Sequence, residues 1–281
     1  YMEDKKAFLG TAPVGKLLFR LALPTVVAQL INMLYNIIDR VYIGHMPEVG
    51  KEALTGVGVC LPLILIVSAF AALVSSGGAP RASINLGEKK YNDAEVILGN
   101  CFSLQIIISV ILTVLLLLFN EQFLMKFGAS SDTIEYATSY MNIYAIGTIF
   151  VQLTLGMNGF ISCQGFTKHS MISVAIGAVV NIILDPVFIF GFNMGVAGAA
   201  LATIIAQCAS TIWVLSFLRS EKSFLKLKLS NMKLQAKVIL PCVLLGLATF
   251  IMQASESIII VCFLKGIRQM YIDFHTHAFN D

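Results

Sequence analysis

The chain has 281 residues, of which 57% are hydrophobic and only 12% are charged. Soluble domains carry about 25% charged residues, so a water-soluble fold of this size could not cover its surface with so few charges. The composition therefore excludes an ordinary soluble enzyme, a disordered chain and a nucleic-acid binder. We expect instead an all-α, polytopic membrane protein embedded in a lipid bilayer.

Seven apolar runs follow one another along the chain. Each can cross about 30 Å of hydrocarbon as a helix, in which every backbone polar group is satisfied internally. The runs lie at about 17–43, 54–80, 96–119, 134–161, 170–192, 196–218 and 238–264. We predict an N-terminus at 1–15, a six-helix unit at 16–218, a basic linker at 219–237, a seventh helix at 238–264 and a tail at 265–281.

The basic residues are divided unequally between alternate loops. Fourteen of the nineteen Lys and Arg residues lie on one side, in the N-terminus, the loop at 81–93, Lys168 and the linker at 219–237. Because cytoplasmic loops are enriched in Lys and Arg, the N-terminus is expected in the cytoplasm and the chain in the plasma (inner) membrane. The linker cluster is interpreted as a topology signal, since aromatic residues that would stack on nucleic acid do not accompany it.

The six cysteines show no metal-binding or disulfide spacing. No two form a C-x-x-C pair, and all lie in or beside apolar runs. We interpret them as small buried apolar residues rather than as a zinc site or a disulfide framework. They are Cys60, Cys101, Cys163, Cys208, Cys242 and Cys262.

An internal repeat links the first and seventh apolar runs. Residues 23–29 (LPTVVAQ) align with residues 247–253 (LATFIMQ) at an offset of 224 residues. Transporters are often built from two repeated halves packed around a central pathway, and six spans per half give both halves the same orientation. The repeat predicts one complete half plus the first helix of a second half, with a missing C-terminal lobe as the expected partner.

Three acidic residues, Asp39, Asp185 and Glu256, fall inside predicted spans. A carboxylate at membrane depth costs about 2.5–3.5 kcal/mol, so such groups are usually functional. Asp185 lies about 11 Å inside the outer end of its span, a similar depth to Thr203 on the next span. Asn181 lies one turn from Asp185 on the same helix face.

Asp39, in the outer half of its own span, completes a layer of four oxygen-bearing side chains with Asn181, Asp185 and Thr203. Two carboxylates, an amide and a hydroxyl are hard oxygen ligands suited to Na⁺ or to holding protons. For Asp39, beside Arg40, the alternative is an acid at a helix end that reaches the interface.

Prolines and amides surround this layer. Pro186 frees the carbonyl of Ile182 and Pro24 can bend the first helix, so both are interpreted as hinge or cavity-shaping residues, although proline in a membrane helix is often only a tolerated kink. The remaining polar residues either line a wet cavity or join helices to one another. They are Asn32, Tyr35, Asn36 and Asn158.

Several segments together resemble the multidrug and toxic compound extrusion (MATE) transporters. The first helix carries PT at 24–25 and NIIDRVYIG at 36–44, and two loops carry ASINLGEK at 82–89 and CQGFTK at 163–168. The fifth-helix signature is NIILDPVFIFG at 181–191. The resemblance covers about residues 12–264.

The resemblance implies an antiporter, not an enzyme, that uses H⁺ or Na⁺ rather than a cofactor to export lipophilic or cationic organic compounds by alternating access between two six-helix lobes. It assigns cation coupling to Asp39, Asn181, Asp185 and Thr203, first-helix bending to Pro24, and the first-lobe cavity to Asn32, Tyr35 and Asn158. Glu256 resembles an acid used in the second lobe by another branch of the family. The alternatives are a lipid-linked oligosaccharide flippase of the same superfamily and an inactive truncated fragment.

The tail departs from the family pattern. Asp273, His275 and His277 form a D-x-H-x-H motif that resembles the opening strand of metal-dependent amidohydrolases. Alternate residues of a strand share a face, so the spacing could bind metal and would define a membrane enzyme. A dozen residues cannot form a barrel, however, and we interpret the tail as a truncated or frameshifted reading, with no metal site.

Overall fold

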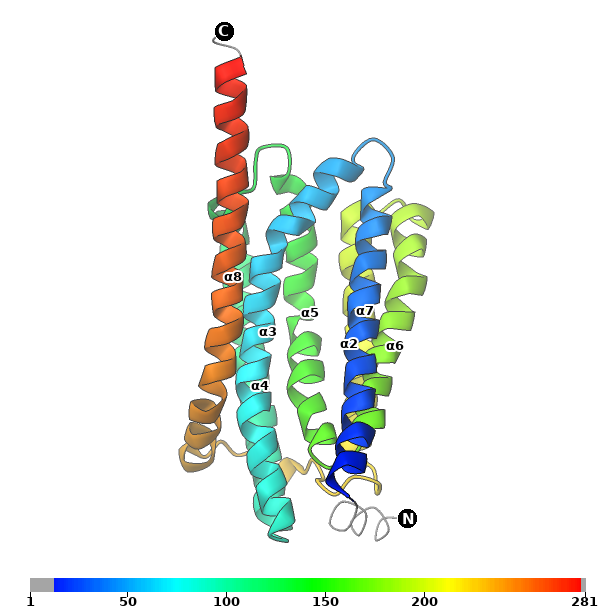
Figure 1. Ribbon diagram of the computed structural model, residues 1–281, viewed down its shortest axis with the longest axis vertical. Coiled ribbons are helices and arrows are strands. Elements are labelled where there is room, and N and C mark those ends of the chain that lie inside the picture. Colours follow the sequence, from blue (N-terminus) through cyan, green and yellow to red (C-terminus); the bar gives the residue numbers. More distant parts are fainter. Residues whose placement is uncertain (1–12, 279–281) are drawn as a thin grey trace.

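The computed structural model describes residues 13–278, a bundle of long helices joined by short loops (Figure 1). Within these residues no strand is present. The long helices are α2 (Val14–Gly44), α3 (Gly50–Gly87), α4 (Tyr91–Phe127), α5 (Ile134–Ser162), α6 (Thr167–Pro186), α7 (Gly195–Arg219) and α8 (Ala236–Ala278). Two short elements are the π-helical turn η1 (Val187–Gly191) and the 3₁₀ turn η2 (Leu229–Asn231).

Seven helices of the described chain are long and apolar enough to cross a membrane. The prediction of an all-α polytopic membrane protein is therefore confirmed. Large apolar side chains such as Leu118, Ile146 and Ile212 are exposed on the outer surface of the bundle. In water such exposure would be costly, whereas in a bilayer these side chains face hydrocarbon.

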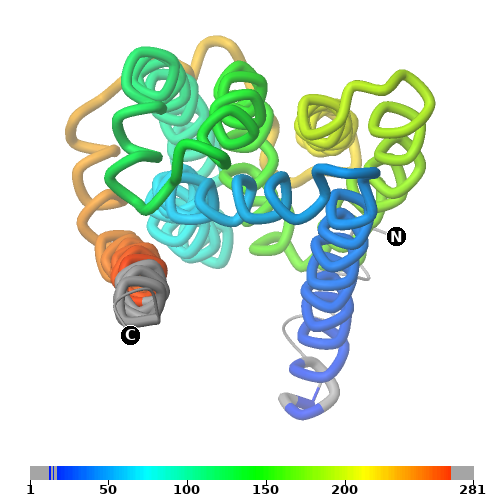
Figure 2. Tube along the Cα trace, turned by 90° about the horizontal axis from the view of Figure 1, so that it is seen from above, coloured from blue at the N-terminus to red at the C-terminus, as the bar shows by residue number. Residues whose placement is uncertain are grey.

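The helices fall into two groups on either side of α5. Figure 1 and Figure 2 place α2, α6 and α7 on one side, and α3, α4 and α8 on the other. The start of α2, the α3–α4 and α5–α6 loops and the linker at 220–235 lie at one end of the bundle, which we call the basic face. The end that carries the α2–α3 loop is called the opposite face.

Two glycines bring α8 against α3. A Cβ atom added at Gly77 would overlap the carbonyl of Cys242, and one added at Gly246 would overlap the carbonyl of Leu73. Small residues allow such close backbone approach between helices in lipid, where dispersion replaces the hydrophobic effect as the packing force. The two helices therefore meet with backbone against backbone.

Polar bonds at both ends fix the register of this contact. Near the basic face, the Arg81 guanidinium donates to the carbonyl of Val238 at 2.9 Å. Farther along, the Ser257 hydroxyl donates to the carbonyl of Pro62 at 2.9 Å. Because the bonds lie on either side of the two glycines, they restrict sliding and rotation of α8 on α3.

The linker between α7 and α8 is bound to the surface of the bundle. The buried carboxylate of Glu95 on α4 accepts a bond from the Lys228 ammonium at 2.5 Å and one from the backbone N–H of Lys226 at 3.3 Å. Asn100 accepts the backbone N–H of Gln235, and Gln164 accepts the backbone N–H of Phe224. Side chains of α4 and of the α5–α6 loop thus satisfy linker backbone groups that a mobile loop would leave to water.

Two features of α8 bear on the sequence-based expectations. The backbone of α8 stays helical to Ala278, so Asp273, His275 and His277 do not have the strand conformation that the D-x-H-x-H resemblance would require. Their side chains lie outside the described residues. Cys262 is exposed, contrary to the prediction, because α8 packs on the bundle along one face only and leaves its other face open.

The other cysteines follow the expectation more closely. Cys60, Cys101 and Cys242 are buried, whereas Cys163 and Cys208 are partly exposed. All of them are free thiols, so no disulfide joins the described helices.

Candidate functional site

Four predicted side chains meet where α2, α6 and α7 approach one another. The Asn181 amide donates to Asp185 Oδ1 at 3.1 Å and to Thr203 Oγ1 at 3.4 Å. The carboxyl group of Asp39 on α2 lies within hydrogen-bonding reach of that of Asp185. The structure thus brings Asp39, Asn181, Asp185 and Thr203 together, and we call them the polar cluster.

The polar cluster carries acceptor oxygens without donors. Asp185 and Asn181 are 0% and 1% exposed, so water outside the bundle does not solvate them. Asp39 Oδ1, Asn181 Oδ1 and Asp185 Oδ2 are buried and accept no hydrogen bond from the described residues. Since a buried oxygen without a donor is costly, the cluster suits a positive species, either a proton shared between the carboxyls or a cation held by several oxygens.

The local backbone explains how Asp185 comes to face α7. Pro186 ends the α-helix, and the chain continues as the π-helical turn η1. A proline cannot donate to the helix ladder, and π-helical turns are frequent at functional sites. Gly198 on α7 lies against this turn, where a Cβ would come within 2.8 Å of the backbone carbon of Phe188. Pro24 lies in the interior of α2.

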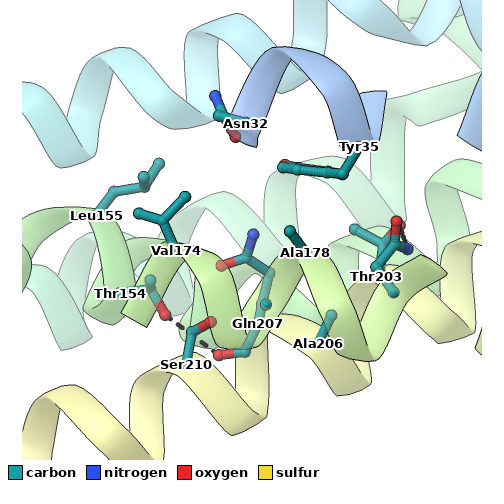
Figure 3. Close-up of a pocket in the computed structure, with 12 residues that line it drawn as sticks. Asn32, Tyr35, Thr154, Leu155, Val174, Ala178, Thr203, Ala206, Gln207 and Ser210 are labelled. Atoms are coloured by element: carbon teal, nitrogen blue, oxygen red, sulfur yellow. Dashed lines mark hydrogen bonds between the residues drawn. The ribbon is translucent and has the colours of Figure 1, made fainter. Parts of the chain in front are cut away.

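A cavity extends from the polar cluster toward the basic face, between α2, α5, α6 and α7. Its empty volume, the open mouth included, is about 410 Å³. Figure 3 shows Gln207 in its centre, with its amide directed toward α2. The lining residues are Asn32, Tyr35, Thr154, Leu155, Val174, Gly177, Ala178, Asn181, Thr203, Ala206, Gln207 and Ser210.

Two of the four residues predicted to line the cavity do so. Asn32 and Tyr35 face it from α2. Asn36 does not: its side chain is exposed and donates to the Asn32 carbonyl of its own helix at 2.7 Å. Asn158 lies one turn from Thr154 toward the basic face and donates to the carbonyl of Ser170 at 3.4 Å. It therefore lies nearer the basic face than the residues that line the cavity.

Glu256 lies apart from the cavity. It is exposed on α8, on the far side of the bundle from the polar cluster. Its neighbour Ser257 faces α3 instead. The described chain therefore offers Glu256 no site of its own.

Other polar residues near the site were not predicted from the sequence. The rings of Tyr140 and Tyr144 on α5 stack with centroids 6.2 Å apart, and the Tyr140 hydroxyl lies within hydrogen-bonding reach of Thr203. Gln207 lies one turn from Thr203 on α7. The spacing of four residues in both pairs is the signal that could have identified them, because residues four apart share a helix face.

The fold and the site define the class of protein: a multi-pass membrane protein whose helices enclose paired carboxyls and a polar cavity, as in membrane transporters. A family model, MatE, matches residues 24–187, which is more than half of the chain. The chain belongs to the MATE family of multidrug efflux transporters.

Known relatives agree with this assignment. The multidrug export protein MepA of Staphylococcus haemolyticus is 25% identical over 252 residues, covering 89% of this chain and 55% of the relative. A solved chain named protein A is 33% identical, with a TM-score of 0.88, covering 96% of this chain and 60% of that one.

A solved multidrug resistance MATE family transporter in an outward-facing conformation is 23% identical, with a TM-score of 0.80, and the match covers 86% of this chain and 53% of that one. This likeness supports the fold alone. The chain spans about half the length of the curated relatives that it matches.

Proposed function

We propose that the chain forms the first lobe, and the first helix of the second lobe, of a cation-coupled antiporter that exports lipophilic or cationic organic compounds. The observation that carries the proposal is the contact between the carboxyl groups of Asp39 and Asp185, buried inside a membrane bundle beside a polar cavity. Two bare carboxylates in contact repel each other, so the pair is most stable with one proton or one cation between them.

Arrival or departure of that cation would couple to the shape of the lobe. Asp39 belongs to α2 and Asp185 to α6, so a bound proton or Na⁺ draws these helices together and its loss drives them apart. A two-state equilibrium between inward-open and outward-open forms is biased by any ligand that prefers one form. The proposed antiport therefore exchanges inward movement of H⁺ or Na⁺ for outward release of the organic substrate.

The chemistry of the cavity favours export of cations and neutral compounds over flipping of lipid-linked oligosaccharides. A flippase would hold a pyrophosphate group with Lys or Arg, whereas the residues lining the described cavity include neither. The cavity offers oxygen acceptors and the Tyr35 ring, and both attract organic cations.

The proposed orientation places the basic face in the cytoplasm and the chain in the plasma membrane. Basic loops gather at the end of the bundle where α2 begins, as cytoplasmic loops do. The exporter is proposed to need the second lobe for transport.

Export from cells tests the proposal. A full-length version of the protein should expel a fluorescent lipophilic cation along an imposed H⁺ or Na⁺ gradient. In the Asp185→Asn variant, the rate of coupled export should fall at least tenfold, because the amide can neither share a proton with Asp39 nor supply a charged oxygen. The matched control is Asp132→Asn, which removes a carboxylate from an exposed loop and should leave export unchanged.

Two outcomes would contradict the proposal. Unchanged coupled export in Asp185→Asn would remove the coupling role of the polar cluster. Movement of a lipid-linked oligosaccharide, without export of the cation, would establish the flippase instead. Drug accumulation in cells that express residues 1–281 alone separates an active chain from an inactive fragment.

A further inference from the structure

Between the polar cluster and the basic face, a series of polar side chains follows the cavity. These side chains are not part of the proposed coupling site. On α7, Gln207 lies one turn from Thr203 toward the basic face, and its Oε1 atom is buried without a hydrogen bond from the described residues. On α5, Thr154 faces the cavity and donates to the backbone carbonyl of Gln207 at 3.2 Å. Asn158, one turn farther, also has a buried Oδ1 atom without a donor from the described residues.

These oxygens lie at successive depths between the polar cluster and the basic face. At about 1.5 Å per residue, Asp185 lies about 27 Å and Asn181 about 21 Å from the start of α6 at the basic face. By the same measure, Gln207 lies about 18 Å from the end of α7 and Asn158 about 6 Å from the end of α5. Thr154 and Ser210 fall between Gln207 and Asn158.

The cavity has a thin polar floor. Asn158 on α5 meets the carbonyl of Ser170 on α6 at 3.4 Å, a long hydrogen bond. The indole of Trp213 on α7 donates to the carbonyl of His169 at 3.2 Å. Each of these residues lies within two turns of the basic-face end of its helix. The rings of Phe166, Phe217 and Phe224 pack together at the same end of the bundle, so the hydrogen-bonded layer is the polar part of what separates the cavity from the aqueous phase.

Four buried side-chain acceptors along this line receive no hydrogen bond from the described residues. Asp185 Oδ2, Asn181 Oδ1, Gln207 Oε1 and Asn158 Oδ1 are all oxygens. Water molecules or a small cation would satisfy such a series, whereas an anion would be repelled by it. An apolar substrate would likewise leave these oxygens without donors.

We propose that a hydrated route for a small monovalent cation, H⁺ on water or Na⁺, runs from the basic face through the Asn158 floor and past Gln207 to the polar cluster. The route is bounded by α2, α5, α6 and α7 and does not require the second lobe. The identity of the cation rests on the proposed function. The existence of the route depends only on the helices of this lobe. Gln207 is a positioning residue between the floor and Asn181, about 12 Å in depth from Asn158 and about 3 Å from Asn181.

Thiol labelling of residues 1–281 in sealed vesicles tests the route without any transport assay. In a background with the six cysteines replaced by alanine, single cysteines are placed at Asn158 and Gln207. Ile205→Cys, two residues away on the exposed face of α7, is the control at matched depth. Lys222→Cys in the linker and Lys51→Cys at the start of α3 report the two faces.

A small cationic methanethiosulfonate added at the basic face should modify Asn158→Cys and Gln207→Cys at least tenfold faster than from the opposite face. Ile205→Cys should react only with a membrane-permeant maleimide. If Gln207→Cys is modified only from the opposite face, or not at all while Lys222→Cys reacts, the route is refuted. Helix content measured by circular dichroism excludes variants that fail to fold.

Carbodiimide modification of Asp185 identifies the cation. NaCl added at the basic face should slow the modification several-fold if the cargo is Na⁺, and acid added there should accelerate it if the cargo is H⁺. Gln207→Leu should lose this response, while Ile205→Leu keeps it. A response only from the opposite face overturns the route, whereas failure of Asp185→Asn to affect export would remove the coupling role and leave the labelling result intact.

Discussion

The two sides of the bundle are built in opposite ways. Where α8 meets α3, glycines bring backbone against backbone, and Arg81 and Ser257 each bond across to a carbonyl of the other helix. Around the cavity that α2, α6 and α7 help to line, the helices leave open space, and three buried oxygens of the polar cluster receive no hydrogen bond from the described residues. The same apolar composition thus produces a contact that resists movement on one side and a space for a cation on the other.

The strongest test of this contrast is a single methyl group at the tight contact. In Gly246→Ala, the new Cβ would overlap the backbone carbonyl of Leu73, which cannot rotate away. We expect a loss of about 2–3 kcal/mol in the free energy of unfolding, measured by thermal unfolding in detergent. Gly58→Ala, with nothing within 4 Å of its added Cβ, is the control and should be neutral or slightly stabilising.

The second test concerns the bound linker. In Glu95→Ala, the linker loses the acceptor for the Lys228 ammonium and for the N–H of Lys226. We expect the free energy of opening the linker to fall by about 1.4 kcal/mol, and by no more, because Lys228 can turn to solvent. This change corresponds to about tenfold faster trypsin cleavage of the linker. Mass spectrometry of the fragments measures the rate. An unchanged rate would mean that the linker is not held by Glu95.

The third test places the same methyl group on the cavity side. In Gly177→Ala, the new Cβ would come within 2.6 Å of Ser210 Oγ, the end of a side chain that can rotate. The hydroxyl would lose its bond to the carbonyl of Ser173, so we expect a loss of about 1 kcal/mol in the free energy of unfolding. If it costs as much as Gly246→Ala, the contrast between the two sides is wrong.

The smallest effect is expected at an exposed ion pair on the same linker. Lys226 lies 2.7 Å from Glu221 and lowers the pKa of that carboxyl by hydrogen bonding and charge. The pair should therefore persist as pH falls to the ordinary glutamate value and be lost only below it. A titration of the ¹³C carboxyl resonance measures this midpoint. Since the pair is exposed, Glu221→Gln should leave the trypsin rate at neutral pH unchanged.

The sequence predicted the spans because lipid leaves few choices to an apolar run. Without water, the backbone must satisfy itself, so β-branched stretches such as 106–108 become helix. Counting residues inward from the ends of two spans placed Asp185 and Thr203 at one depth, and the Asn181 amide indeed bonds to both. The coupling role of these residues stays a prediction.

Rotation and partner choice could not be read from the sequence. Asn36 and Tyr35 are adjacent, and only the packing of α2 decides that Tyr35 faces the cavity while Asn36 is exposed. Glu95 resembles an ordinary acid at a helix start, and its partner Lys228 is 133 positions away. Gly77 and Gly246 likewise acquire their meaning only when α8 is placed on α3.

The linker contacts also determine an order of assembly. A chain is synthesised from its N-terminus, and its domains generally fold as units during synthesis. The residues that bind the linker, Glu95, Asn100 and Gln164, precede it in the sequence and are synthesised before it. The linker can therefore bind to them as soon as it leaves the ribosome. We expect α8 to dock on α3 as soon as it is inserted, which gives any later part of a longer chain a fixed helix on which to build.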